Sequence, residues 1–166
     1  ADVTGVQTCA LPICYAHAEI VLSPAVTATV YAVHLKSNYG ATTAADRSAN
    51  RAKRTVAIRQ LIDQERPKRG KYRAPVIVAG DFNADAWKAE FADEEIFAAL
   101  AEAKFENVLA ALPAFKRVTH PGRGKYGNSV LDYIYLRGLK PAGAPWVWPA
   151  AGISDHNPVF VTLDTP

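Results

Sequence analysis

Cysteine is almost absent from this chain of 166 residues. Its two copies, Cys9 and Cys14, lie close together near the start, and the rest of the chain has none. A structural zinc ion needs four ligands, and only His17 lies near enough in sequence to add one, so these cysteines do not indicate a zinc site. A disulfide between them would close a very short loop and would stabilise the fold little.

Long apolar runs are also missing, and the first residues do not have the composition of a secretory signal. No apolar run reaches the roughly 18 residues that a membrane-spanning helix needs. The first fourteen residues contain no Lys or Arg and include Asp2, whereas a secretory signal begins with a basic stretch. The chain has no internal repeat and no low-complexity linker. Its 49% hydrophobic and 21% charged residues are typical of one globular domain with a core.

A nucleotide sequence that does not belong to the gene can explain the opening segment. Residues 3–13, VTGVQTCALPI, resemble the translation of a common short-read sequencing adapter, with every codon in order. We therefore expect residues 1–14 to be a non-native segment. Residues 15–166 are then expected to form a domain that lacks its natural N-terminal part. For the structure, this predicts that residues 3–13 pack poorly.

Charge is mild overall but uneven along the chain. The formal net charge of +3 does not by itself name a partner. Ten Lys or Arg occur in residues 47–73, where Asp63 and Glu65 are the acids, and eight acids against two lysines occur in residues 81–106. The basic block is either a solvated helix face followed by a basic loop or a surface that attracts polyanions such as nucleic acid.

The apolar patterning predicts strands that alternate with helices. Strands are expected over residues 15–22, 28–35, 74–79, 117–119, 130–136, 145–148 and 159–163. Helices are expected over residues 44–65 and 87–103, the second with an acidic start that suits the helix dipole. In the second strand, Tyr31, Val33 and Leu35 share one face, and His34 lies on the other. This alternation indicates an α/β domain.

Polar side chains occur where several of these strands end. They are His34, Asp81, Asn83, Asp132, Asp155 and His156. Such residues often only pack or form turns, but Asp132 lies among apolar neighbours and needs a partner or an outward-facing position. Open α/β sheets place their sites at the C-terminal ends of strands. Carboxylates suit Mg²⁺ or Mn²⁺, and histidines suit acid–base chemistry near neutral pH, so the set predicts a phosphoester site.

Four motifs occur in order along the chain: HLKS at residues 34–37, GDFN at 80–83, DYI at 132–134 and SDHNPV at 154–159. The series resembles the C-terminal part of the endonuclease/exonuclease/phosphatase superfamily, which includes deoxyribonuclease-like enzymes, neutral sphingomyelinases and inositol-polyphosphate phosphatases. The resemblance covers residues 15–163. It implies an α/β fold, a four-layer α/β sandwich of which this chain supplies the C-terminal half. It also implies hydrolysis of a phosphoester with Mg²⁺ or Mn²⁺.

The resemblance further implies individual roles. His156 is then the general base that takes a proton from the attacking water, and Asp132 orients and charges that histidine. The leading interpretation is a metal-dependent phosphodiesterase, with nucleic acid as one candidate substrate. A phosphomonoesterase or a hydrolase of phospholipid or inositol-phosphate headgroups is the alternative. A truncated inactive fragment or a binding-only module is a further one.

The remaining residues are implied to bind the metal and the phosphate. Asp81 and Asn83 organise the metal and the water, and Asn83 donates to a phosphoryl oxygen. Asp155 is a metal-side carboxylate beside the base. His34 stabilises the phosphate or assists the leaving group. A histidine at this place fits the deoxyribonuclease, sphingomyelinase and phosphatase branches better than the abasic-site endonuclease branch.

One part of the family pattern has no counterpart in this sequence. The family's N-terminal half supplies an Asn and a metal-binding Glu, and Glu19 is the one acid between residue 15 and His34, in a different place. We therefore expect an incomplete metal site and an inner sheet face without its full cover. The isolated chain is accordingly expected to be poorly stable and nearly inactive.

Overall fold

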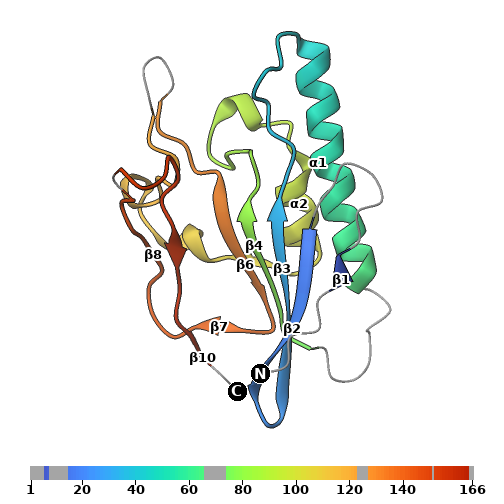
Figure 1. The fold of residues 1–166 in the computed structure, drawn as a ribbon, viewed down its shortest axis with the longest axis vertical. Coiled ribbons are helices and arrows are strands. Elements are labelled where there is room, and N and C mark those ends of the chain that lie inside the picture. Colours follow the sequence, from blue (N-terminus) through green and yellow to red (C-terminus); the bar gives the residue numbers. More distant parts are fainter. Residues whose placement is uncertain (1–5, 8–14, 66–73, 123–126, 151, 165–166) are drawn as a thin grey trace.

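A six-stranded sheet forms the centre of the molecule (Figure 1). The computed structural model describes residues 6–7, 15–65, 74–122, 127–150 and 152–164. The strands of the sheet are β1 (Val6–Gln7), β2 (Tyr15–Ser23), β3 (Val26–His34), β4 (Val76–Asp81), β5 (Glu106–Asn107) and β6 (Asp132–Arg137). Their order is β1-β2-β3-β4-β6-β5. β3 and β4 are parallel, and the other neighbours are antiparallel.

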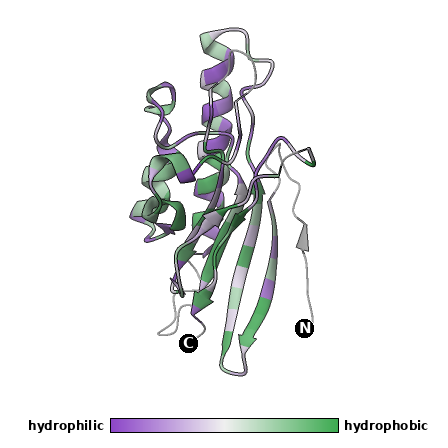
Figure 2. Cartoon of the chain, turned by 90° about the vertical axis from the view of Figure 1, so that its left-hand side faces the viewer, coloured by the Kyte–Doolittle hydropathy of each residue, from purple (hydrophilic) through white to green (hydrophobic). Residues whose placement is uncertain are grey.

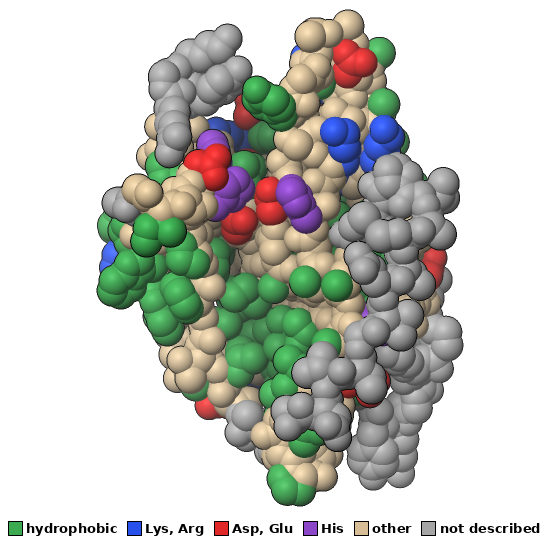
Figure 3. All heavy atoms as spheres, in the orientation of Figure 1, with side chains coloured by type: hydrophobic (Ala, Val, Ile, Leu, Met, Phe, Trp, Pro, Cys, Tyr) green, Lys and Arg blue, Asp and Glu red, His purple; other side chains and the backbone are tan. Residues whose placement is uncertain are grey.

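Two small antiparallel pairs lie beside this sheet (Figure 1). They are β7 (Lys140–Pro141) with β10 (Leu163–Asp164), and β8 (Trp146–Val147) with β9 (Val159–Phe160). β9 contacts β6, so these pairs approach the face of the sheet that the helices leave open. Ile77 and Ile134 on that face are half-buried, and Figure 3 shows the apolar side chains that gather there.

Two helices, α1 (Ala44–Glu65) and α2 (Glu95–Glu102), cover the opposite face of the sheet (Figures 1 and 2). α1 connects the parallel strands β3 and β4 as a crossover. Its buried residues Ile58 and Leu61 pack in one core with Tyr31 and Val33 of β3. The predicted alternation in β3 is confirmed, because Tyr31 and Val33 are buried while His34 is exposed. Neither helix has the length and apolar character that a bilayer-spanning helix needs.

A buried ion pair joins the two helical segments. The side chains of Arg54 on α1 and Glu94 just before α2 are 1% and 3% exposed. Nε and Nη2 of Arg54 both donate to the Glu94 carboxylate. Nη1 of Arg54 donates to the carbonyl of Lys36 at 2.6 Å. The pair therefore also fixes the loop that follows β3, two residues beyond His34.

The acidic residues before α2 neutralise part of the basic block. On the surface, Arg51 pairs with Asp93 at 2.9 Å and Arg59 pairs with Glu95 at 3.0 Å. With the buried pair, three arginines of the block hold α1 against the α2 segment. The two charge blocks of the sequence are thus partners in the fold. The basic residues on α1 therefore fit the interpretation as a helix face better than the interpretation as a surface that attracts polyanions. The predicted basic turn at residues 67–73 lies outside the described residues.

The predicted helix over residues 87–103 is wrong in its first half. The structure has a 3₁₀ turn at Ala89–Phe91, and α2 begins at Glu95. Glu94 precedes α2 with φ −74° and ψ 113°, an extended conformation that interrupts the helix. This conformation turns its carboxylate toward Arg54. Burial of the ion pair overrides the local helix propensity.

Two strand predictions need correction, and the prediction missed two short strands. The segment 159–163 is two short strands, because Val159–Phe160 pair with β8 while Leu163–Asp164 pair with β7. Residues 117–119 are irregular, and an isolated bridge joins His120 to Ser129. β5 and β7 were not predicted, because two residues are too few to show a period.

The predicted poor packing of residues 3–13 falls mostly outside the described residues. Within that segment the structure describes Val6–Gln7, which form β1 and pair with Ala16 and His17 of β2. The division of the chain at residue 14 stays a prediction.

We predict that Glu94→Ala lowers the free energy of unfolding by about 3–5 kcal/mol, because it leaves the Arg54 guanidinium buried without its carboxylate. Glu95→Ala is the matched control, since its surface pair with Arg59 has side chains 61% and 62% exposed. Loss of such a pair costs about 1 kcal/mol or less. Urea unfolding followed by circular dichroism measures both, and equal losses would contradict a special role for the buried pair.

Candidate functional site

Three neighbouring strands bring three of the predicted residues to one edge of the sheet. In the parallel pair β3–β4, His34 lies opposite Asp81. In the antiparallel pair β4–β6, Asp81 lies opposite Asp132. His34 and Asp81 are the last residues of their strands, and Asp132 is the first of its strand. Residues far apart in the sequence thus meet through strand register.

Gly80 permits this register directly before Asp81. Its φ is +137°, and a Cβ atom at this position would lie 2.0 Å from the carbonyl oxygen of Val33 on β3. The backbones approach so closely that only a glycine fits. The glycine of the GDFN motif is therefore required for β3 and β4 to pair beside the site.

Asn83 fixes the carboxylate of Asp81. Its backbone N–H donates to Asp81 Oδ1 at 2.8 Å, and its Nδ2 donates to Asp81 Oδ2 at 2.8 Å. Nδ2 also donates to the carbonyl of Leu35 at 3.0 Å. Asn83 has φ +50°, a left-handed conformation that asparagine tolerates better than most residues. The turn therefore ties Asp81 to the end of β3.

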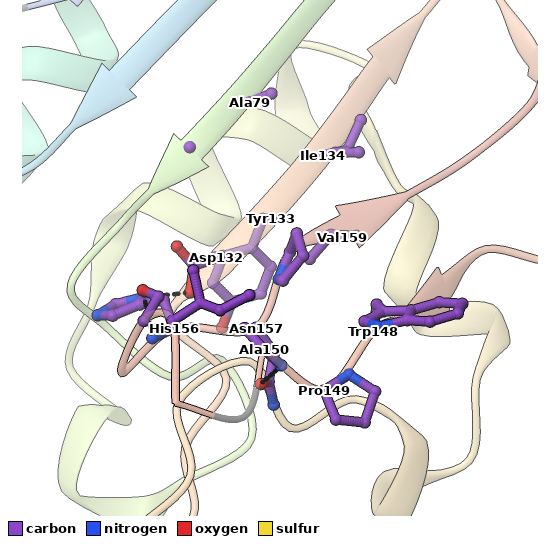
Figure 4. A pocket seen from close by; sticks show the side chains of 14 residues that line it. Ala79, Asp132, Tyr133, Ile134, Trp148, Pro149, Ala150, His156, Asn157 and Val159 are labelled. Atoms are coloured by element: carbon purple, nitrogen blue, oxygen red, sulfur yellow. Dashed lines mark hydrogen bonds and ion pairs between the residues drawn. The ribbon is translucent and has the colours of Figure 1, made fainter.

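His156 reaches the same edge from the loop before β9. Its Nδ1 lies 2.7 Å from Oδ2 of Asp132, and the dashed line in Figure 4 marks this contact. An ionised carboxylate accepts hydrogen bonds, so the hydrogen is assigned to Nδ1. In the neutral ring, Nε2 then keeps a lone pair. The structure thus brings together Asp132 and His156, the two residues to which the family resemblance gives linked roles.

The loop that carries His156 is anchored by two residues that sequence reasoning missed. The backbone N–H of Asn157 donates to the carbonyl of Thr119 at 2.6 Å. Oγ1 of the buried Thr119 accepts from the backbone N–H groups of Leu131 and Asp132 at 2.8 and 3.0 Å. Thr119 and Asn157 thus place both members of the Asp132–His156 pair. The position of Asn157 between His156 and Pro158 could have indicated its role from the sequence. Nothing in the sequence indicated the role of Thr119.

The surroundings shift the pKa of two groups at the site. Burial raises the pKa of Asp81 and the negative charge of Asp132 raises it further, although the N–H of Asn83 and nearby histidines oppose this. For His156, burial lowers the pKa, but the hydrogen bond and charge of Asp132, aided by other carboxylates, outweigh it and raise the pKa overall. The raised pKa of His156 thus reflects the carboxylates around it, whereas the raised pKa of Asp81 reflects mainly its burial.

His34 is close to Asp81 but open to water. Its Nε2 lies 3.5 Å from Oδ2 of Asp81, and its side chain is 77% exposed. The imidazole is therefore accessible to a ligand that approaches the edge of the sheet.

Asp155 lies with two histidines. His120, Asp155 and His156 each offer one ligand atom, and these atoms lie within 4.8 Å of one another. Asp81, which was predicted to share a metal with Asp155, is not a member of this group among the described residues. His120 was not predicted, because it lies in a segment that reads as a Gly-rich connection.

An apolar cavity of about 590 Å³ opens beside Asp132 and His156. Ile134, Trp148 and Ile153 contribute to its lining, and Figure 4 shows Ile134 on β6 and Trp148 among the residues around it. Trp148 and Ile153 are exposed. The cavity can therefore hold an apolar group next to the imidazole.

Gly80→Ala is expected to lower the free energy of unfolding by about 2–5 kcal/mol, because a Cβ meets the Val33 carbonyl and the backbone keeps a positive φ. Gly143→Ala is the control, since a Cβ there meets nothing within 4 Å. The control should stay within about 0.5 kcal/mol of the wild type. Chemical denaturation measures both, and an unaffected Gly80→Ala variant would refute the close approach of β3 and β4.

We expect Asp132→Asn to lower the pKa of His156, because it removes the charge that raises this pKa and leaves the burial that lowers it. In the wild type the folded pKa lies above the unfolded one. The pair therefore stabilises the fold below the unfolded pKa, and this stability is lost as pH rises through the folded pKa. NMR titration of the ring protons measures the shift. Asp93→Asn, a surface carboxylate paired with Arg51, is the control, and an equal effect there would contradict the assignment.

Three solved structures share this fold at low sequence identity. D. rerio TDP2, solved with a single strand DNA product, has a TM-score of 0.65 and 17% identity over 98% of this chain and 67% of that one. An endonuclease/exonuclease/phosphatase from Beutenbergia cavernae DSM 12333 has a TM-score of 0.68 and 15% identity over 96% and 44%. Sphingomyelinase C from Streptomyces griseocarneus has a TM-score of 0.56 and 22% identity over 89% and 56%. The chain thus spans 44% to 67% of the length of these three proteins.

These likenesses confirm the predicted α/β fold of the deoxyribonuclease-like type. No curated protein matches the chain. The Endonuclease/Exonuclease/phosphatase family matches residues 4–156, a range that begins inside the segment interpreted as an adapter translation. The match covers most of the chain and confirms the resemblance that the four motifs indicate. The chain belongs to the Endonuclease/Exonuclease/phosphatase family.

Proposed function

We propose that the chain carries the base-bearing part of a phosphodiester hydrolase that uses Mg²⁺ or Mn²⁺ and activates water by general-base catalysis. The observation that supports this most is the 2.7 Å contact between His156 and Asp132 at the strand edge where Asp81 also lies. Family membership supports the reaction class, a hydrolase of phosphoesters.

His156 acts as the base through Nε2. Asp132 accepts the hydrogen of Nδ1, which leaves the lone pair of Nε2 to take a proton from water. The ring becomes positive as the proton arrives, and the adjacent Asp132 carboxylate stabilises that charge. Because the reaction needs the neutral ring, the rate should rise with pH through the raised pKa of His156.

His34 and Asn83 have different tasks in this proposal. The exposed imidazole of His34 contacts the phosphate or the leaving group. Asn83 was expected to donate to a phosphoryl oxygen, but its amide group already donates to Asp81 and to the Leu35 carbonyl. Asn83 is therefore proposed as a positioning residue for the Asp81 carboxylate.

The divalent cation is proposed at Asp81. Asp81 lies opposite Asp132 on the neighbouring strand, and two carboxylates placed in this way offer the oxygen ligands that a hard divalent cation prefers. Asn83 can add its side-chain oxygen, whereas Asp155 lies with His120 and is a less direct ligand than predicted. Such an ion supplies positive charge that stabilises the transition-state phosphate.

Nucleic acid is the first candidate substrate. The similar D. rerio TDP2 was solved with a single strand DNA product. The basic block adds less support than the sequence indicates, because three arginines of α1 are held in ion pairs. The proposal of a nucleic-acid substrate therefore rests on the residues of the proposed phosphodiester site and not on the basic block.

The apolar cavity favours a second candidate, a phosphodiester with an apolar part such as a phospholipid. The cavity lies directly beside His156, and its lining includes Trp148 and Ile153. Sphingomyelinase C from Streptomyces griseocarneus shares the fold.

Three substrates tested in parallel distinguish these candidates: supercoiled plasmid, bis-p-nitrophenyl phosphate and phospholipid vesicles. The gene product that contains residues 15–166 is assayed with Mg²⁺, with Mn²⁺ and with EDTA. We expect turnover of at least one diester that EDTA abolishes. Untouched plasmid beside hydrolysed small diester would reject nucleic acid, and no hydrolysis at all would reject the enzyme in favour of a binding module.

His156→Ala should lower kcat by roughly 10²–10⁴-fold, the usual contribution of a general base. Asp93→Ala, which removes a surface ion pair away from the site, serves as the control and should keep its kcat. Steady-state rates on the best diester measure both variants. Full turnover by His156→Ala would rule out its role as the base.

A further inference from the structure

A second group of potential metal ligands lies beside the proposed base. It consists of His120, Asp155 and His156, whose ligand atoms lie within 4.8 Å of one another. His120 comes from the segment before β6, and the other two come from the loop before β9. Figure 3 shows histidine and acidic side chains gathered near the upper end of the sheet. The proposed hydrolysis leaves His120 without a task.

Both histidines are held in place. The backbone N–H and carbonyl of His120 both bond to Ser129, at 2.9 Å each. Its ring meets the ring of His156 edge-on, with centroids 4.9 Å apart. The ring of His156 is fixed by Asp132 through Nδ1. The backbone of His120 and the ring of His156 are therefore held before any ion arrives, and the two rings are in contact.

The donor set favours a transition metal over Mg²⁺. Two imidazole nitrogens and one carboxylate suit Zn²⁺, whereas Mg²⁺ prefers oxygen ligands. Ligand atoms of a tetrahedral zinc site lie about 3.3–3.5 Å apart, so the group must close by roughly 1.5 Å at most. Asp155 is exposed and can supply this movement by a change of rotamer.

Asp132 completes the arrangement as an outer partner. A metal-bound histidine commonly donates its other ring N–H to a carboxylate, which orients the ring and makes it a better ligand. The Asp132–His156 contact has this form, because Nδ1 is bonded to the carboxylate and Nε2 is the nitrogen that remains to bind an ion.

We propose that His120, Asp155 and His156 bind a transition-metal ion of the Zn²⁺ type, with a fourth position open to water or a phosphate oxygen. The site is distinct from the hard-cation site at Asp81. Its consequence rests on the proposed function: an ion on Nε2 of His156 takes the lone pair that accepts the proton from water. Zn²⁺ therefore inhibits the hydrolysis that Mg²⁺ or Mn²⁺ supports.

Direct binding of Zn²⁺ tests the site independently of activity. The full chain competes for Zn²⁺ with a chromophoric chelator, and all proteins are also measured with Cys9→Ser and Cys14→Ser, so that thiolate binding is separated. His120→Gln should weaken Zn²⁺ binding by roughly tenfold or more, and Asp132→Asn by about 10- to 100-fold. His34→Gln is the matched control, since this histidine faces Asp81 instead, and it should keep the affinity.

Ring-proton NMR adds a readout that unfolding alone cannot imitate. Zn²⁺ should shift the signals of His120 and His156 together at one equivalent and should leave His34 unchanged. Equal affinity in wild type and His120→Gln, equal losses in His120→Gln and His34→Gln, or no saturable binding would each overturn the site.

Inhibition provides the second arm. In the active gene product, Zn²⁺ added at saturating Mg²⁺ should inhibit diester hydrolysis. His120→Gln should raise the half-inhibitory Zn²⁺ concentration by the factor by which it weakens Zn²⁺ binding. Hydrolysis without Zn²⁺ binding would refute the inferred site and leave the proposed function unchanged. Zn²⁺ binding without hydrolysis would support the inferred site and refute the proposed function.

Discussion

The close approach of β3 to β4 at Gly80 is the constraint on which the site depends. A side chain there would collide with the Val33 carbonyl, so the two strands can meet in this register only at a glycine. The register sets His34 opposite Asp81, and the next strand sets Asp132 opposite Asp81. The backbone positions of His34, Asp81 and Asp132 are therefore set by the hydrogen bonds of the sheet, whereas His156 comes from a loop.

Around this edge, buried polar contacts hold the segments that the sheet itself does not fix. Arg54 joins the loop after β3 to Glu94, and Thr119 and Asn157 join the loop of His156 to β6. Such groups are costly to bury unless every partner is present, so each of them also specifies one arrangement of its loop. The same contacts that complete the fold thus orient the proposed base and the strand edge.

The strand edge and the neighbouring loops present two different kinds of potential metal ligand. Asp81 and Asp132 present oxygen atoms at the strand edge, where burial and, less strongly, the charge of Asp132 raise the pKa of Asp81. The loop side presents imidazoles, with His120 and His156 in ring contact. Hard and borderline cations are therefore expected to prefer different places, the strand edge at Asp81 and the group of His120, Asp155 and His156.

Local patterns in the sequence determined α1, the hairpin β2–β3, the apolar strand β4 and the motifs that indicate the family, because periodicity and short motifs are properties of neighbouring residues. The break before α2, the split of the last strand and the roles of Thr119 and His120 depend on partners distant in the chain. The charge blocks show this most clearly. Composition marked them as separate features, and only the tertiary structure made them partners, because ion pairs form between residues that folding brings together.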